Sequence, residues 1–149
     1  MSNDDVSVAT TPNAARVGGL LLVLAGAVGL LYLAQLYGFL SLSALPAPSW
    51  VMLGVIALCS TAALVFGVGY SRARRWALGP AAATAFVLWA TSGIWSLVAF
   101  AGGYVSMFGF MLPSASMTAG ILIIVTYKGC RRAAEARERL ASEGLDLGV

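Results

Sequence analysis

The chain has 149 residues, of which 60% are hydrophobic and only 10% are charged. Soluble domains carry about 25% charged residues, so this composition excludes an ordinary water-facing surface and predicts that lipid is the solvent. The net charge of +3 does not indicate nucleic acid, which we exclude as a partner, because the basic residues lie at the ends of apolar segments, where they orient membrane helices and meet anionic headgroups.

Charged residues are absent from two long parts of the chain. No Asp, Glu, Lys, Arg or His lies between Arg16 and Arg72, or between Arg75 and Lys128. A helix needs about 20 apolar residues to cross the hydrocarbon core of a bilayer, so each part has room for two helices and a turn. Short connections make consecutive helices antiparallel neighbours, and the sequence predicts an all-α, integral membrane four-helix bundle of up-down-up-down order. The predicted helices are residues 17–40, 50–70, 76–101 and 107–127.

The polar segment at the start of the chain, residues 1–15, is predicted to be a flexible cytoplasmic tail. A signal peptide is the alternative, since small residues at Ala25 and Ala27 could form a cleavage site. The apolar run continues to Leu40 and the tail lacks a basic n-region, so we expect an uncleaved first helix. The predicted organisation is a tail of residues 1–15, a bundle of residues 16–128, and a cytoplasmic C-terminal helix and tail of residues 129–149.

The first predicted helix carries three polar side chains near its far end. Tyr32 and Tyr37 suit an interfacial aromatic belt. Gln35 needs a hydrogen-bond partner if it is buried in lipid, and can then join two helices; alternatively, its depth places it near headgroups and water. The connector that follows contains Pro46 and Pro48, which are expected to stop helix continuation.

The third predicted helix has a mild polar character. Its hydroxyl side chains are those of Thr84, Thr91, Ser92 and Ser96. A polar stripe of this kind could line a pore, but Ser and Thr in membrane helices more often bond to their own backbone carbonyls, which is the interpretation we prefer. Trp89 lies at mid-helix, away from either interface, and is expected to pack at a helix–helix contact, with pigment or quinone contact as the lesser alternative.

The fourth predicted helix begins with the soft apolar segment 107–117, which contains three methionines and could form an adaptable surface. After it, residues 128–142 are predicted to form a short helix that stops at Gly144. Glu135 and Arg139 have the spacing of a surface ion pair. Because the apolar face of this helix is thin, we expect the fourth span simply to continue into water for a few turns, and a docking helix for a partner is the alternative.

Small residues are spaced so that helix backbones could approach one another in lipid. The spacing predicts either packing inside one bundle, which we prefer, or an interface between copies of the chain. These candidate packing residues are Ala63, Gly67, Ala81, Ala85, Ser92, Ser96, Ala99, Gly103, Ser116 and Gly120.

Basic residues predict the orientation of the bundle. They occupy the N-terminal side, the second connection and the C-terminal side, whereas the first and third connections carry no charge. The positive-inside rule therefore places both termini in the cytoplasm, and the short loops suggest a prokaryotic cytoplasmic membrane. The residues that set this topology are Arg16, Arg72, Arg74, Arg75, Lys128, Arg131 and Arg132.

Chemistry-bearing motifs are missing from the sequence. It has no histidine, and no carboxylate lies within a predicted span, which argues against haem ligation through histidine and against transport coupled to an intramembrane acid. Cys59 and Cys130 would lie too far apart for a disulfide and are expected to be free thiols. No phosphate-binding loop, zinc pattern or hydrolase elbow occurs. We therefore expect no enzyme activity, no metal and no cofactor.

The function that these features favour is that of a non-catalytic accessory or structural subunit, which packs by helix faces against copies of itself or against a membrane-protein partner. Two alternatives stay open. One is a homo-oligomeric pore or membrane-permeabilising protein, since hydrophobic pores need no charged residues. The other is a binder of an apolar ligand such as a lipid, pigment or quinone.

Overall fold

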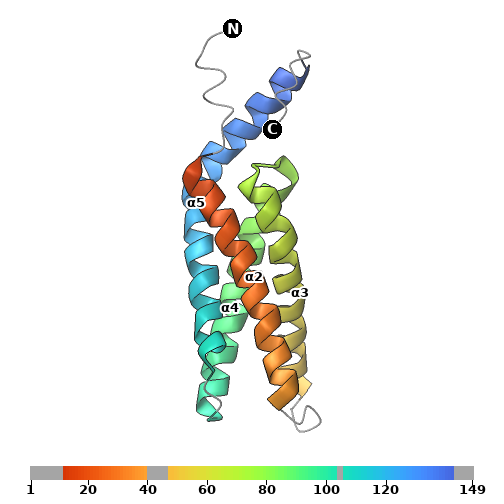
Figure 1. Cartoon of the computed structure of the whole chain (residues 1–149), viewed down its shortest axis with the longest axis vertical. Helices are drawn as coiled ribbons and strands as arrows, with labels where there is room; N and C mark the ends of the chain where they lie inside the picture. The colour runs from red at the N-terminus through yellow and green to blue at the C-terminus, as the bar shows by residue number, and fades with distance from the viewer. Residues whose placement is uncertain (1–11, 40–46, 104–105, 143–149) are drawn as a thin grey trace.

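The computed structural model describes residues 12–39, 47–103 and 106–142, and in these residues it contains four helices and no strand (Figure 1). Each helix is long and apolar enough to cross a membrane. The predicted all-α fold of four helices is confirmed, and the fourth span continues into the C-terminal helix without a break, as expected, so that the two are one helix of 36 residues. The helices are α2 (Asn13–Phe39), α3 (Ala47–Ser71), α4 (Arg75–Ala101) and α5 (Met107–Ser142).

Two prolines mark where helices begin. The carbonyl oxygen of Pro12 accepts the amide of Ala15 at 2.9 Å, and Ala15 is fully buried. Helix α2 therefore begins at Asn13, within the segment predicted as a tail, and residues 1–11 of that segment lie outside the described part. Pro48 is the second residue of α3, where its missing amide costs little, so it starts this helix instead of lying in a connector; Pro46 is outside the described residues.

The four helices form a ring in which each packs against the next and α5 returns beside α2 (Figure 1). Consecutive helices are antiparallel, as the short connections predict. The turn between α3 and α4 has only three residues, 72–74, and its middle residue Ala73 adopts a positive φ of 49°. Gly103, in the turn after α4, has a φ of 78°, which glycine adopts without steric penalty.

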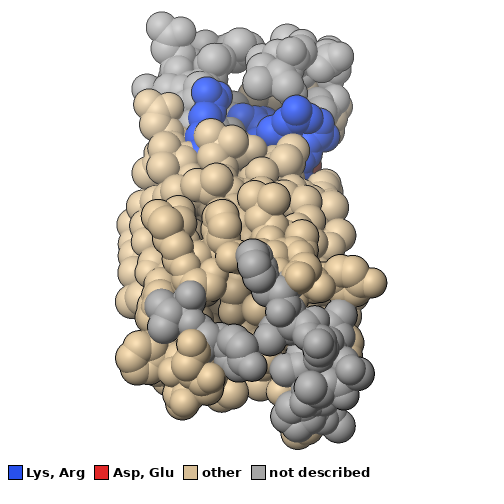
Figure 2. All heavy atoms as spheres, turned by 60° about the horizontal axis from the view of Figure 1, so that its bottom comes forward, with Lys and Arg blue, Asp and Glu red and all other residues tan. Residues whose placement is uncertain are grey.

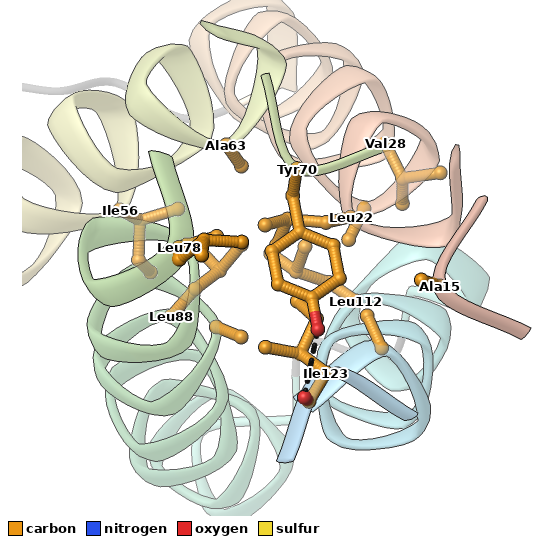
Figure 3. Packing of buried hydrophobic residues seen from close by; sticks show 14 of the residues in the cluster. Ala15, Leu22, Val28, Ile56, Ala63, Tyr70, Leu78, Leu88, Leu112 and Ile123 are labelled. Atoms are coloured by element: carbon orange, nitrogen blue, oxygen red, sulfur yellow. Dashed lines mark hydrogen bonds between the residues drawn. The ribbon is translucent and has the colours of Figure 1, made fainter. Parts of the chain in front are cut away.

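The interior is filled by aliphatic side chains from all four helices (Figure 3). Leu22, Ile56, Leu88, Leu112 and Ile123 are fully buried and come from α2, α3, α4 and α5. Large hydrophobic side chains also cover the outside of every helix. A helix that is apolar on all sides is typical of a membrane span.

Helices α2 and α3 approach each other closely through glycine. A Cβ atom on Gly19 would lie 2.6 Å from the carbonyl oxygen of Gly67, and one on Gly67 would lie 2.7 Å from the carbonyl oxygen of Gly19. Further along, Gly26 and Gly29 meet Ser60 in the same way, at its carbonyl and at its hydroxyl. Only glycine permits this backbone contact, which gives dispersion energy in lipid, where helices are not driven together by water.

Beyond Tyr127, helix α5 leaves the ring and crosses the α3–α4 turn (Figure 1). We call residues 128–142 the α5 extension, and the end of the bundle that it covers the charged end; the opposite end is the uncharged end. The inner face of the extension consists of buried residues: Cys130, Ala133, Ala134 and Leu140. The extension is therefore solvated on its outer face only, where Lys128, Arg131 and Arg132 are exposed.

Candidate functional site

Hydrogen bonds between helices gather at the two ends of the ring, and a buried tyrosine lies at each. At the uncharged end, Tyr32 of α2 is 2% exposed, and its hydroxyl accepts the indole N–H of Trp95 of α4 at 2.8 Å. The prediction that Tyr32 belongs to an interfacial belt is wrong, because burial of both rings requires each polar tip to find a partner inside the bundle. Tyr37, in contrast, is 75% exposed.

Gln35 also lies at the uncharged end and is half-buried. Its side-chain oxygen accepts a hydrogen bond from the hydroxyl of Ser106, which precedes α5, at 3.0 Å. The amide thus has the interhelical partner that a carboxamide at this depth requires. Together with the Tyr32–Trp95 pair, it links α2 to both α4 and α5.

A proline creates a third polar contact at this end. Pro113 lies inside α5 and has no amide hydrogen to donate to the carbonyl of Gly109, four residues earlier. The hydroxyl oxygen of Ser96 in α4 lies 2.5 Å from this carbonyl oxygen and 2.7 Å from that of Ser92, so its single proton is shared between the two acceptors. One serine therefore satisfies the acceptor that the proline leaves open. The backbone bonding expected of the hydroxyls in α4 is confirmed for Ser92 and Ser96.

At the charged end, Tyr70 of α3 is fully buried and points into α5 (Figure 3). Its hydroxyl donates to the carbonyl of Ile123 at 2.9 Å and lies 2.9 Å from the hydroxyl of Thr126. Thr126 itself bonds to the carbonyl of Leu122 at 2.6 Å. This contact fixes α3 against α5 just before the α5 extension begins. Both cysteines are free thiols, as predicted.

The predicted small-residue face of α4 lies inside the chain. Ala81, Ala85, Ser92 and Ala99 are buried, and Ser96 is half-buried. Gly103 is not on this face, because α4 ends at Ala101 and Gly103 is an exposed turn residue.

The other predicted packing residues lie inside the chain as well. Gly67 and the fully buried Ala63 are on the side of α3 that contacts α2. Ser116 is fully buried, and a Cβ on Gly120 would lie 3.6 Å from that of Ala85 in α4. Small residues therefore pack helices of one chain together.

The outward side of α4 carries large residues. Trp89 is 38% exposed, and its ring centroid lies 5.8 Å from that of Phe86, whose side chain is also exposed. Trp89 does not lie between helices of this chain, because the small residues of α4 occupy that side. On α5, Met107, Met111 and Met117 of the soft segment are exposed too.

All the basic residues predicted to set the topology lie at the charged end, and Figure 2 shows Lys and Arg gathered at one end of the face it displays. The α5 extension is fixed there by two polar contacts. Arg75 forms an ion pair with Glu138 at 2.7 Å, and Arg137 donates to the backbone carbonyl of Arg72 at 2.8 Å. These contacts join α5 to the arginine-rich turn between α3 and α4.

A shallow, open depression of about 220 Å³ lies beside the α5 extension, and the described residues that line it are Lys128, Arg131, Arg132 and Glu135. Arg131 and Glu135 form an ion pair at 2.9 Å, so Glu135 pairs with the preceding turn of the helix and not with Arg139 as predicted. Within residues 12–39, 47–103 and 106–142, no group of three or more His, Cys, Asp or Glu side chains could hold a metal ion.

Sequence reasoning missed the two tyrosine contacts and the docked α5 extension. In the sequence, Tyr32 and Tyr70 are marked only as hydroxyl-bearing residues of apolar helices. Such a residue is equally typical of the membrane–water interface. No family model, curated protein or solved structure matches the chain, so similarity to known proteins gives no functional information.

Proposed function

We propose that the chain spans a membrane with its charged end in the cytoplasm, and that it is a non-catalytic accessory or structural subunit acting through its outer surface. Four helices of sufficient length and apolarity support the membrane part. The segregation of Lys and Arg to one end supports the orientation through the positive-inside rule. A prokaryotic cytoplasmic membrane remains the expected location.

One observation carries the subunit proposal: side chains of the chain itself fill the interior of the bundle. Leu22, Ile56, Leu88 and Leu112 close the middle of the ring. The tyrosine and serine hydroxyls at both ends bond within the chain. A partner protein would therefore bind at the outer surface. Phe86 and Trp89 of α4 are exposed there, and large aromatic side chains are enriched at protein interfaces.

Gentle solubilisation followed by native mass spectrometry tests this proposal. We expect a defined assembly with a second membrane protein or with further copies of the chain. Replacing Phe86 and Trp89 together with alanine should dissociate it, whereas replacing Leu58 and Val65, which are exposed on α3, should not. A chain that remains a monomer in every mild detergent and lipid nanodisc would contradict the subunit role.

The pore alternative requires more than one copy of the chain. Because fully buried side chains fill the centre of the ring, a conducting path would have to form between subunits. Ion flux in liposomes that rises steeply with the amount of protein per vesicle, together with a closed ring of identical chains, would favour this alternative. A pigment, quinone or tightly held lipid in the purified protein would favour an apolar-ligand binder instead.

A further inference from the structure

The outer face of α5 changes abruptly from apolar to basic along a single stripe. At 100° per residue, its members share a sector about 120° wide. The apolar part consists of Met117, Ile121, Ile124 and Val125, and the polar part of Lys128, Arg131, Arg132 and Glu135. All four apolar residues are exposed, at 50% to 73% of their surface. The three cations are exposed as well.

We propose that this stripe is a binding site for one anionic phospholipid, which we call the α5 lipid site. Its acyl chains would lie along Ile121, Ile124 and Val125, and its phosphate would lie against the exposed Lys128, Arg131 and Arg132. The inference rests on the proposed membrane-spanning arrangement, but it does not depend on the subunit role.

Dimensions support a lipid as the occupant. The exposed apolar part, from Met117 to Val125, is about 12 Å long at the rise of an α-helix. One leaflet of the hydrocarbon core is about 15 Å thick, half of the roughly 30 Å of a bilayer. The first cation, Lys128, comes three residues after Val125. The cations therefore lie at the depth of the phosphate of a lipid whose acyl chains span this leaflet.

Charge supports the same occupant. The three cations and Glu135 leave a surplus of two positive charges, which complements a phosphate group. Glu135 is paired with Arg131, and this contact orients the guanidinium along the helix. Lys128 and Arg132 make no hydrogen bond or ion pair with the residues that the structure describes, so both remain available to a phosphate.

Competing lipids of equal chain length test the site. The purified chain in mild detergent is titrated with phosphatidylglycerol or with phosphatidylcholine, and the bound lipid is counted by native mass spectrometry. We expect preferential binding of one phosphatidylglycerol. The double variant Lys128→Gln/Arg132→Gln should lower its affinity by about tenfold or more, because each basic residue near an anionic headgroup contributes strongly to binding.

A charge-matched variant, Arg16→Gln/Arg74→Gln, removes two exposed cations from the same end of the bundle but outside the stripe. It should retain the affinity of the original chain. Equal losses in both double variants would overturn the proposal, since they would indicate a general effect of net charge. Equal binding of the two lipids by the original chain would overturn it too.

Two further measurements separate this site from other occupants. Glycerol phosphate added in excess should leave the bound phosphatidylglycerol in place; its displacement would assign the cations to a soluble phosphate and contradict a lipid site. A protein held at the stripe in place of lipid, lost in Lys128→Gln/Arg132→Gln, would contradict it as well. A chain that stays dissolved without detergent and binds neither lipid would refute the membrane-spanning arrangement itself, whereas indiscriminate lipid binding refutes only the α5 lipid site.

Discussion

Glycine at the α2–α3 contact has a defined steric role, which can be tested by adding one methyl group. Gly67→Ala would place a Cβ 2.7 Å from the carbonyl oxygen of Gly19, so the two backbones must separate. We expect the free energy of unfolding to fall by about 1–3 kcal/mol, as for other overpacked sites. The measurement is reversible unfolding by sodium dodecyl sulfate in mixed micelles, followed by circular dichroism.

Gly54 provides the matched control because it lies in the same helix and a Cβ there would meet nothing within 4 Å. Gly54→Ala should leave stability unchanged or raise it slightly, since alanine is the better helix former. Equal effects of Gly54→Ala and Gly67→Ala would mean that the close approach of α2 and α3 contributes nothing.

Ser96 and Pro113 are coupled through the backbone carbonyl of Gly109, which Ser96 contacts because Pro113 has no amide hydrogen to donate to it. Ser96→Ala leaves the carbonyl of Gly109 without its donor and should lower stability by about 0.5–1.5 kcal/mol. Pro113→Ala restores a backbone amide that can donate to the same carbonyl. In the Pro113→Ala background, Ser96→Ala should therefore cost less, and a double-mutant cycle in mixed micelles measures this coupling.

The hydroxyl of Ser114 serves as the control for this cycle, because it bonds to a carbonyl of its own helix, that of Phe110, on an exposed face. Ser114→Ala should show no coupling to the α4 contact. Strictly additive effects of Ser96→Ala and Pro113→Ala would show that the serine does not compensate for the proline.

At the scale of the helix, the positions of the elements could be predicted from the sequence, but their inward faces could not. Length and apolarity define a span, so the ends of α4 fall within one residue or so of the predicted range 76–101. Inside a soluble protein, hydrophobic periodicity would mark the buried side. In a span, both sides are apolar, and this is why the burial of Tyr32 inside the bundle could not be predicted.

Residue size is the better guide to the inward face of these helices. Six of the nine buried positions of α4 are alanine, serine or threonine, and the other three are Leu78, Leu88 and Trp95, whereas Phe86, Trp89 and Phe100 are exposed. Small residues let backbones approach, and lipid accepts large side chains without cost. Docking of the α5 extension on its own chain could not be predicted for a related reason. The apolar face that it buries is thin and consists largely of alanines such as Ala133 and Ala134.

Docking of the α5 extension predicts the reactivity of Cys130. This thiol is fully buried and should react slowly with a water-soluble maleimide in a Cys59→Ser background. Ala134→Arg introduces a charge at a position of the extension that is 4% exposed. It should raise the labelling rate by about tenfold or more, equivalent to about 1.4 kcal/mol of lost docking free energy.

Ser142→Arg adds the same side chain at an exposed position of the same extension and should leave the labelling of Cys130 unchanged. Glu138→Gln removes the exposed ion pair with Arg75 and should have only a small effect, because such pairs contribute roughly 0–1 kcal/mol. Unaltered protection of Cys130 in Ala134→Arg would show that the thiol is covered by the bundle and not by docking of the extension.

At the scale of the whole molecule, the two ends of the bundle differ in charge while its interior is closed between them. The charged end joins the α3–α4 turn to the α5 extension through Arg75, Glu138 and Arg137. The uncharged end is held by neutral bonds, such as that between Trp95 and Tyr32. In the proposed membrane-spanning arrangement, this asymmetry would favour one orientation, because moving arginine across the hydrocarbon core is costly and the neutral end would cross more readily.

Single cysteines at the two ends test this orientation in intact cells of an expression host. In a chain lacking Cys59 and Cys130, Gly102→Cys places a thiol at the exposed turn after α4, where φ is −82°, and Arg74→Cys places one at the exposed α3–α4 turn. An impermeant maleimide added from outside should label Gly102→Cys at once. Arg74→Cys should react only after permeabilisation, since its turn bears the arginines that the positive-inside rule retains in the cytoplasm. Labelling of both thiols from outside, or of Arg74→Cys alone, would refute the proposed arrangement, and with it the leaflet to which the α5 lipid site is assigned.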